Sequence, residues 1–371
     1  MNERISFGVV GGYGATGQAV VSELSKSGTD HILIGGPNLA RGSALASKYD
    51  GQASATRVDV LDTSSVDEFC RQCSIVVNCA GPVKALRDRV AQAAFRQHCH
   101  YIDPAGMRFV AEGMRSKSDE IADLGLSFIV SAGWMPGISE VVSVYAHALA
   151  KRQMDTVESV TVYYGDSGEW SANALRDGVW YLRQLGGGSP SYFHKGRRVR
   201  LSRSAVLSTT NLGKPIGIRR FGMFFTPELN EIGGKLDDCE VRAYSYVSGF
   251  RAILASTAIA LLPIPEGLSV RLLRNVFRRN QELPVGGFVV ARAIGHSQRR
   301  PMTLTVQIVY EAGRDYWVHG LAIATAARMV AEGKGVQKGV HFLADAVDAQ
   351  SFLKRLKADG VEHTESVEPY E

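Results

Sequence analysis

The segment "FGVVGGYGATGQAVVSELSKSG", residues 7–28, dominates the interpretation of this chain, because four glycines follow an apolar run within seven positions. The pattern G-x-G-x-x-G lies between a predicted strand and a predicted helix, which is the context in which it binds a dinucleotide. Its first glycine permits a tight turn, its second lets a pyrophosphate approach the backbone, and its third lets helix and strand pack closely. The residues predicted to surround the cofactor here are Gly12, Tyr13, Gly14, Ala15, Thr16 and Gly17.

The chain up to about residue 135 alternates short apolar runs with amphipathic stretches. The apolar runs are residues 5–10, 31–35, 55–60, 74–79, 100–103 and 126–131, and the amphipathic stretches are 16–26, 39–49, 65–70, 84–97 and 109–123. Strands joined by helical crossovers form parallel sheets that are covered by helices on both faces. We therefore predict an α/β fold, a Rossmann doubly wound parallel sheet, with an inserted α+β second domain.

The position after the second predicted strand indicates which dinucleotide is bound. Proteins that bind NAD usually carry Asp or Glu there, about twenty residues beyond the glycines, to bind the ribose hydroxyls. This chain has no carboxylate between Asp30 and Asp50, whereas Asn38, Arg41 and Ser43 could surround a 2′-phosphate with Arg41 as its charge partner. The sequence favours NADP(H) over NAD(H).

Length, charge and cysteine content limit the remaining possibilities. A chain of 371 residues with 45% hydrophobic and 21% charged residues is long enough for two domains. The net charge is +5, and basic residues gather at 194–203 and 271–279, which favours an anionic substrate or an acidic partner such as a carrier protein. Nucleic acid is disfavoured because no aromatic-interleaved basic module accompanies this charge.

The N-terminal residues "MNERISFGVV" lack the apolar core and cleavage site of a signal peptide, and five irregularly spaced cysteines do not suggest a disulfide framework. The longest apolar stretch, residues 252–268, is interrupted at Pro263 and is too short to span a bilayer. We expect a cytoplasmic protein that does not bind membranes.

Two other motifs were weighed and set aside. Cys70 and Cys73 have the C-x-x-C spacing of a zinc site, but no second close pair of ligands follows, so we expect no metal. Gly11, Gly14 and Gly17 also fit the glycine pattern of short-chain reductases, whose catalytic Tyr-x-x-x-Lys pair is missing from this chain. A non-catalytic, NADP(H)-sensing module remains an alternative.

Five stretches together resemble the saccharopine dehydrogenase (saccharopine reductase-like) family of two-domain NAD(P)-dependent oxidoreductases. They are "GGYGATGQAV" (11–20), "VVNCAGPV" (76–83), "HYIDPAG" (100–106), "SAGWMPGISEVV" (131–142) and "ATAARMVAEGKGVQKGV" (324–340). The resemblance implies a dinucleotide-binding domain over residues 1–135, an α+β substrate and dimerisation domain over 136–314, and a helical segment over 315–371 that returns to the first domain. The acidic end, residues 360–371, has no apolar periodicity, and we expect no regular structure there.

The family's chemistry implies an enzyme that transfers a hydride to or from an imine or carbonyl carbon of a small, carboxylated metabolite, and we expect a homodimer. A reductase of a carrier-bound substrate is a further alternative. Resemblance specifies cofactor chemistry better than it specifies substrate, because function resides in the site rather than in the fold.

The resemblance also implies roles for particular residues of the first domain. Asp59 is expected near the adenine, Asp103 below the nicotinamide ring, and Trp134 and Met135 facing the ring, although both could equally belong to the core. The residues expected beside the nicotinamide ribose are Asn78, Ala80, Gly81 and Pro82.

The second domain contributes the candidate catalytic residues. The stretch 163–188 runs from a strand through a polar turn, with Asp166 and Trp170, into a helix that carries Arg176 and Arg183. These arginines are seven residues apart, which places them on one helical face, where they could hold a substrate carboxylate. Turn and core roles for these residues are the alternative.

Overall fold

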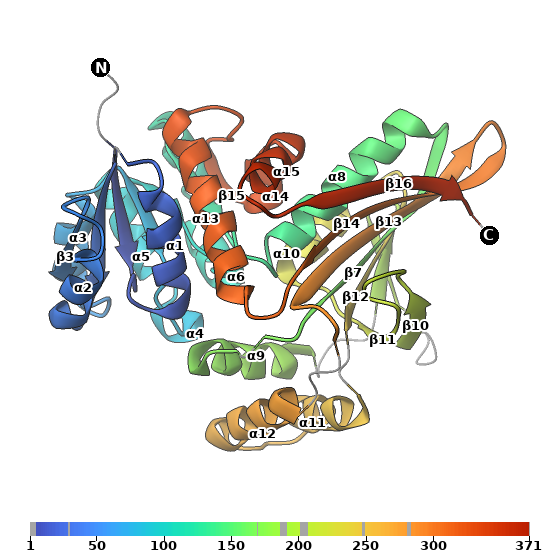
Figure 1. Cartoon of the computed structure of the whole chain (residues 1–371), viewed down its shortest axis with the longest axis horizontal. Helices are drawn as coiled ribbons and strands as arrows, with labels where there is room; N and C mark the ends of the chain where they lie inside the picture. The colour runs from blue at the N-terminus through green and yellow to red at the C-terminus, as the bar shows by residue number, and fades with distance from the viewer. Residues whose placement is uncertain are drawn as a thin grey trace. The chain divides into compact units, whose positions relative to one another are not determined.

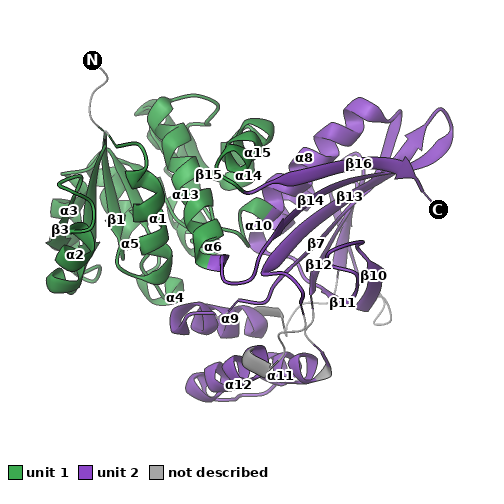
Figure 2. Ribbon diagram, viewed as in Figure 1, with its two compact units in different colours: residues 1–138, 316–360 green, residues 139–315, 361–371 purple. Residues whose placement is uncertain are grey.

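The computed structural model divides the chain into two compact units, which are coloured separately in Figure 2. Unit 1 comprises residues 1–138 and 316–360, and unit 2 comprises residues 139–315 and 361–371. The structure describes residues 5–28, 30–168, 170–185, 191–200, 207–246, 249–279 and 283–370. Each unit has its own sheet, and each is described separately.

Unit 1 contains a parallel sheet in the order β15-β6-β5-β4-β1-β2-β3 (Figure 1). Its strands, among the described residues, are β1 (Ser6–Val10), β2 (His31–Gly36), β3 (Ala53–Arg57), β4 (Ile75–Asn78), β5 (His100–Ile102), β6 (Ser127–Val130) and β15 (Gly339–Phe342). All the neighbouring pairs in this sheet run parallel. The predicted parallel sheet is confirmed, and its strand order reverses between β1 and β4, next to the glycine-rich segment.

Helices connect these strands. They are α1 (Ala15–Ser25), α2 (Leu39–Ala46), α3 (Thr63–Cys70), α4 (Val83–Leu86), α5 (Arg89–Arg96), α6 (Met107–Arg115), α7 (Ser118–Asp123), α13 (Asp315–Glu332), α14 (Leu343–Ala346) and α15 (Ala349–Ala358). The stretches 84–97 and 109–123, each predicted as one helix, are both divided into two. The first interruption is at Arg87, whose φ of +52° is incompatible with a right-handed helix.

Strands β1, β2 and β4 are buried along nearly their whole length, as expected for a sheet covered on both faces. One of the core clusters of unit 1 joins Val10, Leu33 and Val76 from these strands to Phe69 of α3 and Val90 of α5. Each fully buried aliphatic side chain contributes about 1.5–3 kcal/mol to folding. This core positions the carboxyl ends of the strands, where the candidate site lies.

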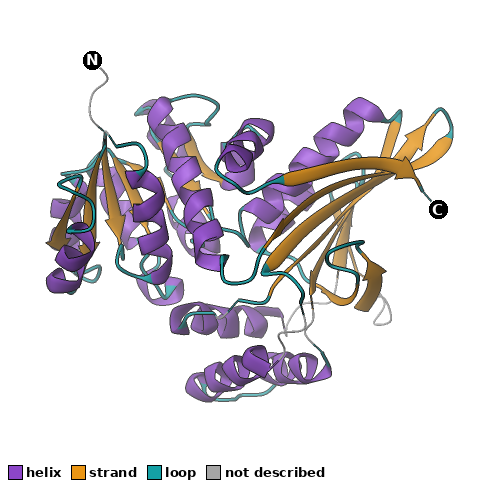
Figure 3. Cartoon of the chain, viewed as in Figure 1, coloured by secondary structure: helices purple, strands orange, loops and turns teal. Residues whose placement is uncertain are grey.

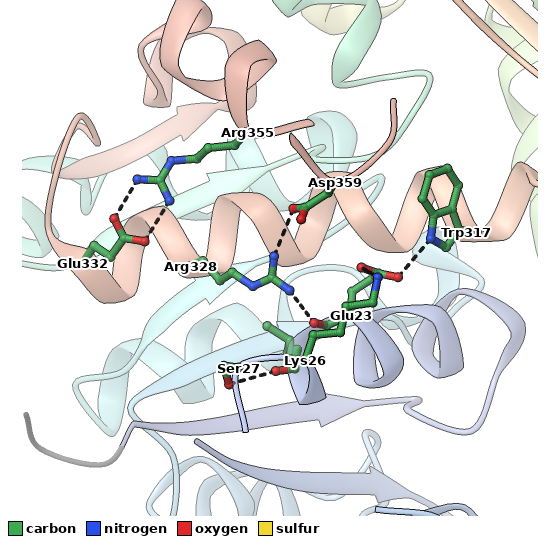
Figure 4. A network of polar contacts seen from close by, with 9 residues as sticks. Glu23, Lys26, Ser27, Trp317, Arg328, Glu332, Arg355 and Asp359 are labelled. Atoms are coloured by element: carbon green, nitrogen blue, oxygen red, sulfur yellow. Dashed lines mark hydrogen bonds and ion pairs between the residues drawn. The ribbon is translucent and has the colours of Figure 1, made fainter. Parts of the chain in front are cut away.

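Helix α13 is tied to α1 by polar contacts, which Figure 4 shows. The indole nitrogen of Trp317 donates to Oε1 of the buried Glu23 at 2.9 Å, and the Arg328 guanidinium contacts both the Glu23 carbonyl and, at 3.2 Å, the Asp359 carboxylate. A Cβ on Gly320 would meet the Cβ of Ala19, so the two helices pack closely. These contacts tie α13 directly to the helix that follows the glycine-rich loop.

Unit 2 contains a mixed sheet, whose strands are drawn in orange in Figure 3. Its main path is β10-β11-β12-β7-β13-β14-β16. Its described strands are β7 (Thr156–Asp166), β8 (Ser191–His194), β9 (Arg197–Arg200), β10 (Leu207–Asn211), β11 (Ile218–Met223), β12 (Glu240–Tyr246), β13 (Gly287–Ser297), β14 (Arg300–Tyr310) and β16 (His363–Pro369). Strands β13 and β14 form an antiparallel hairpin. Strands β12 and β7 pair in parallel, whereas the other neighbours along this path are antiparallel.

The helices of unit 2 are α8 (Ile138–Gln153), α9 (Ala172–Leu185), α10 (Pro227–Lys235), α11 (Phe250–Leu261) and α12 (Glu266–Arg279). The first residue of α8, Ile138, is also the last residue of the first stretch of unit 1. Helices α9, α11 and α12 share a small apolar core around Val179, Ile259 and Leu273. No helix within the described ranges is long and apolar enough to cross a membrane.

The acidic end of the chain corrects one expectation. We predicted that residues 315–371 return as a helical segment to the first domain and end without regular structure. Residues 316–360 do belong to unit 1, with helices α13, α14 and α15, and β15 adds a strand to its sheet. The expectation for the end of the chain is wrong, because β16 pairs with β14 in unit 2. Strand β16 is exposed along most of its length, so apolar periodicity gave no sign of it. Its backbone hydrogen bonds to β14 provide the pairing.

Candidate functional site

The glycine-rich loop after β1 turns at Gly11. This residue has φ of +74°, and a Cβ there would lie 2.8 Å from the backbone nitrogen of Ala80. The left-handed backbone and the close approach of a second loop both require glycine. We had assigned the tight turn to Gly12, and the structure corrects this assignment.

Gly12 and Gly17 allow the loop and helix to pack closely. A Cβ on Gly12 would lie 2.9 Å from the Val9 carbonyl oxygen, and one on Gly17 would lie 2.6 Å from the Gly12 Cα. Both contacts are shorter than side chains normally tolerate. The structure confirms the predicted role of Gly17 in bringing α1 against the loop.

The start of α1 has the properties of an anion site. Gly14 is the N-cap residue and provides no side-chain hydrogen bond, and the first turn contains no acidic residue. Gly14 and Ala15 are exposed, and Thr16 is partly buried. A Cβ on Gly14 would have only the Gly11 carbonyl oxygen nearby, at 3.1 Å. Backbone N–H groups and the helix dipole at such an open N-terminus favour an anionic diphosphate, which fits the bare glycine surface.

Tyr13 connects this loop to the start of α2. Its hydroxyl accepts a hydrogen bond from the backbone N–H of Asn38 at 2.9 Å, and the guanidinium carbon of Arg41 lies 4.8 Å from its ring centroid. A Cβ on Gly36 would touch the tyrosine ring, so only glycine leaves room for this arrangement at the end of β2. The structure thus brings together three predicted cofactor residues.

Asn38 and Asp59 are both engaged locally. Asn38 is the N-cap of α2, where its Oδ1 accepts from the backbone N–H of Arg41 at 3.0 Å. Asp59 lies in the exposed loop after β3, and its Oδ1 accepts from the backbone N–H of Leu61 at 2.9 Å. Arg41 is exposed and carries a positive charge at this end of the sheet, where Arg57 ends β3 and is also exposed.

Strands β4 and β5 contribute a buried polar network. The Asn78 side chain donates to the Tyr101 hydroxyl at 3.2 Å and accepts from the Ala80 backbone N–H at 3.1 Å. Asp103 Oδ1 accepts from the backbone N–H groups of Ser131, at 3.1 Å, and of Gly106. The network fixes the loop of Ala80, Gly81 and Pro82, in which Pro82 caps α4.

Asp103 is only 2% exposed. Burial raises the pKa of Asp103 to about 6, although its hydrogen bonds from Ser131 and Gly106 favour the ionised form. Its protonation state therefore changes close to neutral pH.

A small pocket of about 20 Å³ lies at this network, at the carboxyl ends of β4 and β5. Its lining residues include Asn78, Ala80, Leu86, Arg87, Asp103 and Gly106. Tyr101 and Arg87 were not among the predicted site residues. Tyr101 could have been found, because it lies two residues before Asp103 in an extended segment, which places both on the same face. Arg87 follows the short helix α4, and only its place at the pocket indicates a role.

Trp134 and Met135 follow β6 and behave differently. Trp134 is fully buried, and its backbone N–H donates to Nδ1 of His319 at 3.3 Å, whereas Met135 is partly exposed. Burial lowers the pKa of His319 to about 4, so this ring is a neutral acceptor. The burial of Trp134 favours the core role over contact with a nicotinamide. Gly137, with φ of +132°, permits the turn into α8.

Unit 2 places Asp166 and Trp170 in contact. The indole nitrogen of Trp170 donates to Asp166 Oδ1 at 3.0 Å, while the Trp170 ring is 40% exposed and lies 5.3 Å from the Phe277 ring centroid. Burial, with a further contribution from the negative charge of Asp315, raises the pKa of Asp166 to about 6, against the opposing hydrogen bond from Trp170.

Tyr310 and Asp315 belong to the same cluster of unit 2. The Tyr310 hydroxyl donates to Asp315 Oδ1 at 2.9 Å, and burial together with the charges of Asp166 and Asp315 raises the pKa of Tyr310. A Cβ on Gly168 would lie 2.5 Å from the Asp315 carboxylate, so the turn after β7 approaches it closely. Asp166 is thus surrounded by a tyrosine, a tryptophan and a second carboxylate, a set that sequence spacing did not reveal.

Arg176 and Arg183 do not form the predicted fork. Arg183 donates to the Ile264 carbonyl and to Ser269 Oγ, at 3.3 Å, and so links α9 to the segment before α12 and to α12 itself. Arg176 is exposed and contacts Asn173 Oδ1 at 3.4 Å. The structure gives Arg183 a structural role, which corrects the expectation that both arginines hold substrate.

The fold and the open, uncapped helix start at the glycine loop together define unit 1 as an NAD(P)-binding domain at the carboxyl edge of a parallel sheet. Residues 7–129 match the model of the saccharopine dehydrogenase NADP-binding domain, and this part of the chain belongs to that family.

Similar proteins agree with this assignment. The chain is 29% identical over 143 residues to a human saccharopine dehydrogenase-like oxidoreductase, covering 38% of this chain and 32% of that protein. It is 26% identical over 174 residues to the mouse counterpart, covering 46% of this chain and 38% of that protein. The alignments thus span only about a third of the length of these relatives.

Among solved structures, the apo saccharopine dehydrogenase (L-Glu forming) of Saccharomyces cerevisiae superposes with a TM-score of 0.70. The match covers 98% of this chain and 100% of that one at 14% identity. At this identity the likeness concerns the fold, a parallel Rossmann-like sheet with a second, mixed-sheet domain.

Proposed function

We propose that this protein is an NADP(H)-dependent oxidoreductase that transfers a hydride to or from an imine or carbonyl carbon of a small, carboxylated metabolite. The observation that carries the proposal is the connected surface of Gly14, Tyr13 and Arg41, which offers an open helix N-terminus and a cation but no carboxylate. When bound, the cofactor supplies or accepts the hydride. The protein binds and orients the reactants and manages the proton.

The preference for NADP(H) rests on Arg41. A 2′-phosphate beside its guanidinium gains charge-assisted hydrogen bonds that a ribose hydroxyl cannot form. Tyr13 supports this guanidinium through its ring and holds the start of α2 through its hydroxyl. The geometry supports recognition of the phosphate by a preformed surface.

The pocket at Asn78 and Asp103 has a volume of about 20 Å³, which is room for about one water molecule, so it would take a single polar group of a substrate rather than a whole metabolite. Arg87 lies at this pocket, and its guanidinium carbon is 5.4 Å from the Phe109 ring centroid. We propose that Arg87, rather than Arg176 or Arg183, binds the carboxylate of the substrate.

We further propose that Asp166, in unit 2, acts as a general acid or base. A carboxyl group with a pKa near 6 is present in both protonation states close to neutral pH, which suits a general acid or base. The hydrogen bond from Trp170 orients its carboxylate, and Tyr310 and Asp315 stabilise the surrounding cluster.

The test is oxidation of NADPH in the presence of paired amines and keto acids. Arg87→Ala should raise KM at least about ten-fold with little change in NADPH affinity, because one charge-assisted contact is worth about 1.5–3 kcal/mol. Arg96→Ala is the matched control, since Arg96 pairs with Asp67 on a surface helix. Asp166→Asn should lower kcat by about 100-fold or more.

The alternative function, a non-catalytic NADP(H)-sensing module, predicts a different result in the same assay. If NADPH binds with high affinity but no substrate pair supports its oxidation, the result favours a non-catalytic, redox-sensing module. If Arg87→Ala and Arg96→Ala have the same KM, the anionic substrate is bound elsewhere.

A further inference from the structure

Three potential metal ligands converge in unit 2, away from the residues discussed above. His147 lies on α8, whereas Asp238 and Cys239 lie in the segment before β12. The ligand atoms of these three side chains all lie within 4.8 Å of one another. His147 and Cys239 are 8% and 2% exposed, whereas the Asp238 side chain is 38% exposed. The group is therefore enclosed on one side and accessible on the other.

The relative positions of the three groups are set by the fold. His147 Nε2 lies 2.9 Å from Asp238 Oδ1, although the two residues are 91 positions apart in the chain. The backbone carbonyl of Cys239 accepts from the Lys195 N–H at 3.0 Å, and the following β12 lies between β11 and β7. Small side-chain adjustments would bring the three ligand atoms to bonding distances of about 2.0–2.3 Å from one ion.

The donor set selects among metals. One imidazole nitrogen, one thiolate sulfur and one carboxylate oxygen form a mixed, borderline-soft set, which suits Zn²⁺ and disfavours Mg²⁺ and Ca²⁺. Three protein ligands leave a fourth tetrahedral position for water, on the exposed side at Asp238. A purely structural zinc site would normally have four protein ligands.

We propose that His147, Asp238 and Cys239 form a binding site for a zinc-class divalent cation. On binding, the Cys239 thiol loses its proton to solvent and the sulfur forms the metal bond. The proton on His147 Nε2, which the Asp238 carboxylate accepts in the metal-free protein, shifts to Nδ1 through solvent, so the imidazole stays neutral, and Nε2 and Asp238 each form one metal bond. No oxidation or reduction is involved.

Lys151 is the competing group. It lies one turn after His147 on α8, and its Nζ contacts Asp238 Oδ2 at 2.7 Å. In the metal-free protein, this ammonium balances the carboxylate and holds α8 against the segment before β12. A bound cation would be repelled by the ammonium, so Lys151 weakens the site and sets its affinity.

The experiment uses the full chain after treatment with a chelator, titrated with Zn²⁺ and, as a spectroscopic probe, Co²⁺. We expect one ion per chain, about one proton released per ion, and a thiolate-to-cobalt absorption band. Cys239→Ser should abolish that band and weaken Zn²⁺ binding by about 10-fold or more. The matched control is Cys73→Ser in unit 1, which should bind like the wild type.

Lys151→Met provides the opposite change. Removal of the ammonium should strengthen Zn²⁺ binding several-fold, an effect that a purely structural interaction would not produce. Asp238→Asn keeps the size of the side chain and should weaken Zn²⁺ binding. This variant is preferred to one at His147, whose buried side chain is more readily needed for folding. The proposal is overturned if Zn²⁺ does not bind, if Cys239→Ser binds like the wild type, or if Lys151→Met leaves the affinity unchanged or lower.

Discussion

The hydroxyl of Tyr13 accepts a hydrogen bond from the backbone N–H of Asn38 at 2.9 Å, across 25 positions of the chain. This contact joins the glycine-rich loop after β1 to the start of α2 after β2. Because Arg41 packs over the same ring, one tyrosine holds together the surfaces proposed for the diphosphate and the 2′-phosphate. It is the natural first residue to test.

Tyr13→Phe removes the hydroxyl and keeps the ring beside Arg41. The Asn38 N–H loses its partner, so we expect a cost of about 1 kcal/mol and a few-fold weaker NADPH affinity. Tyr13→Ala should weaken NADPH binding further, because Arg41 also loses its support. Fluorescence titration with NADPH checks both, and equal affinities for the wild type and both variants would contradict the role.

Gly14→Val fills the space over the start of α1. The backbone φ of residue 14 is −74°, which valine can adopt, and the new side chain has only the Gly11 carbonyl oxygen nearby. The fold should therefore remain intact while the proposed diphosphate position is blocked. We expect loss of NADPH binding with nearly unchanged thermal stability. Gly17→Ala should do the reverse and destabilise the fold, because its Cβ collides with Gly12. An unchanged NADPH affinity in Gly14→Val would refute the placement of the diphosphate.

Arg41→Ala tests the cofactor preference. Loss of a charge-assisted contact costs about 1.5–3 kcal/mol, so NADPH affinity should fall about ten-fold or more while NADH affinity changes little. Isothermal titration with both cofactors measures the two losses. Equal losses would show that Arg41 supports the fold around Tyr13 rather than the phosphate.

Arg183→Ala and Arg176→Ala separate structural from substrate roles in α9. Arg183 holds the Ile264 carbonyl and Ser269, so its removal should destabilise the protein by about 1–3 kcal/mol, whereas Arg176→Ala should change stability by less than about 0.5 kcal/mol. Thermal unfolding gives the comparison. A variant at Arg183 with wild-type stability and reduced kcat/KM would restore the substrate role.

His100 predicts a pH dependence of stability. Its Nδ1 accepts from the Ser127 backbone N–H at 3.0 Å, and burial, together with the charge of Lys338, lowers its pKa to about 4. The unfolded chain binds this proton near its ordinary pKa of about 6.5, whereas the native protein does not until about pH 4. The contribution of neutral His100 to the free energy of unfolding is therefore complete above pH 6.5. It is lost as the pH falls toward 4, by at most about 3 kcal/mol.

His100→Asn keeps an acceptor near the Nδ1 position without a titratable group. The difference in unfolding free energy between this variant and the wild type should therefore shift in favour of the variant as pH falls through that window. A pH-independent difference would show that the His100 imidazole has the same pKa in the native and the unfolded protein. Asp103 and Asp166, whose pKa values are raised to about 6, act in the opposite direction and remain in both proteins.

The sequence alone predicted a parallel sheet and the succession of its first six strands and crossover helices along the chain. It also showed the glycine motif and the absence of a carboxylate after the second strand. These features are local, because apolar periodicity and turn residues are read within a few positions of the chain. The match of residues 7–129 to the saccharopine dehydrogenase NADP-binding domain confirms the prediction of a dinucleotide-binding domain.

Only the tertiary structure decided which residues meet. The turn lies at Gly11 because the loop at Ala80 packs against it, and Arg183 is structural because Ile264 and Ser269 lie beside it. The exposed strand β16 forms by backbone pairing with β14. Each outcome depends on a contact between distant segments, whose free energy is set by packing and hydrogen-bond geometry that no local pattern records.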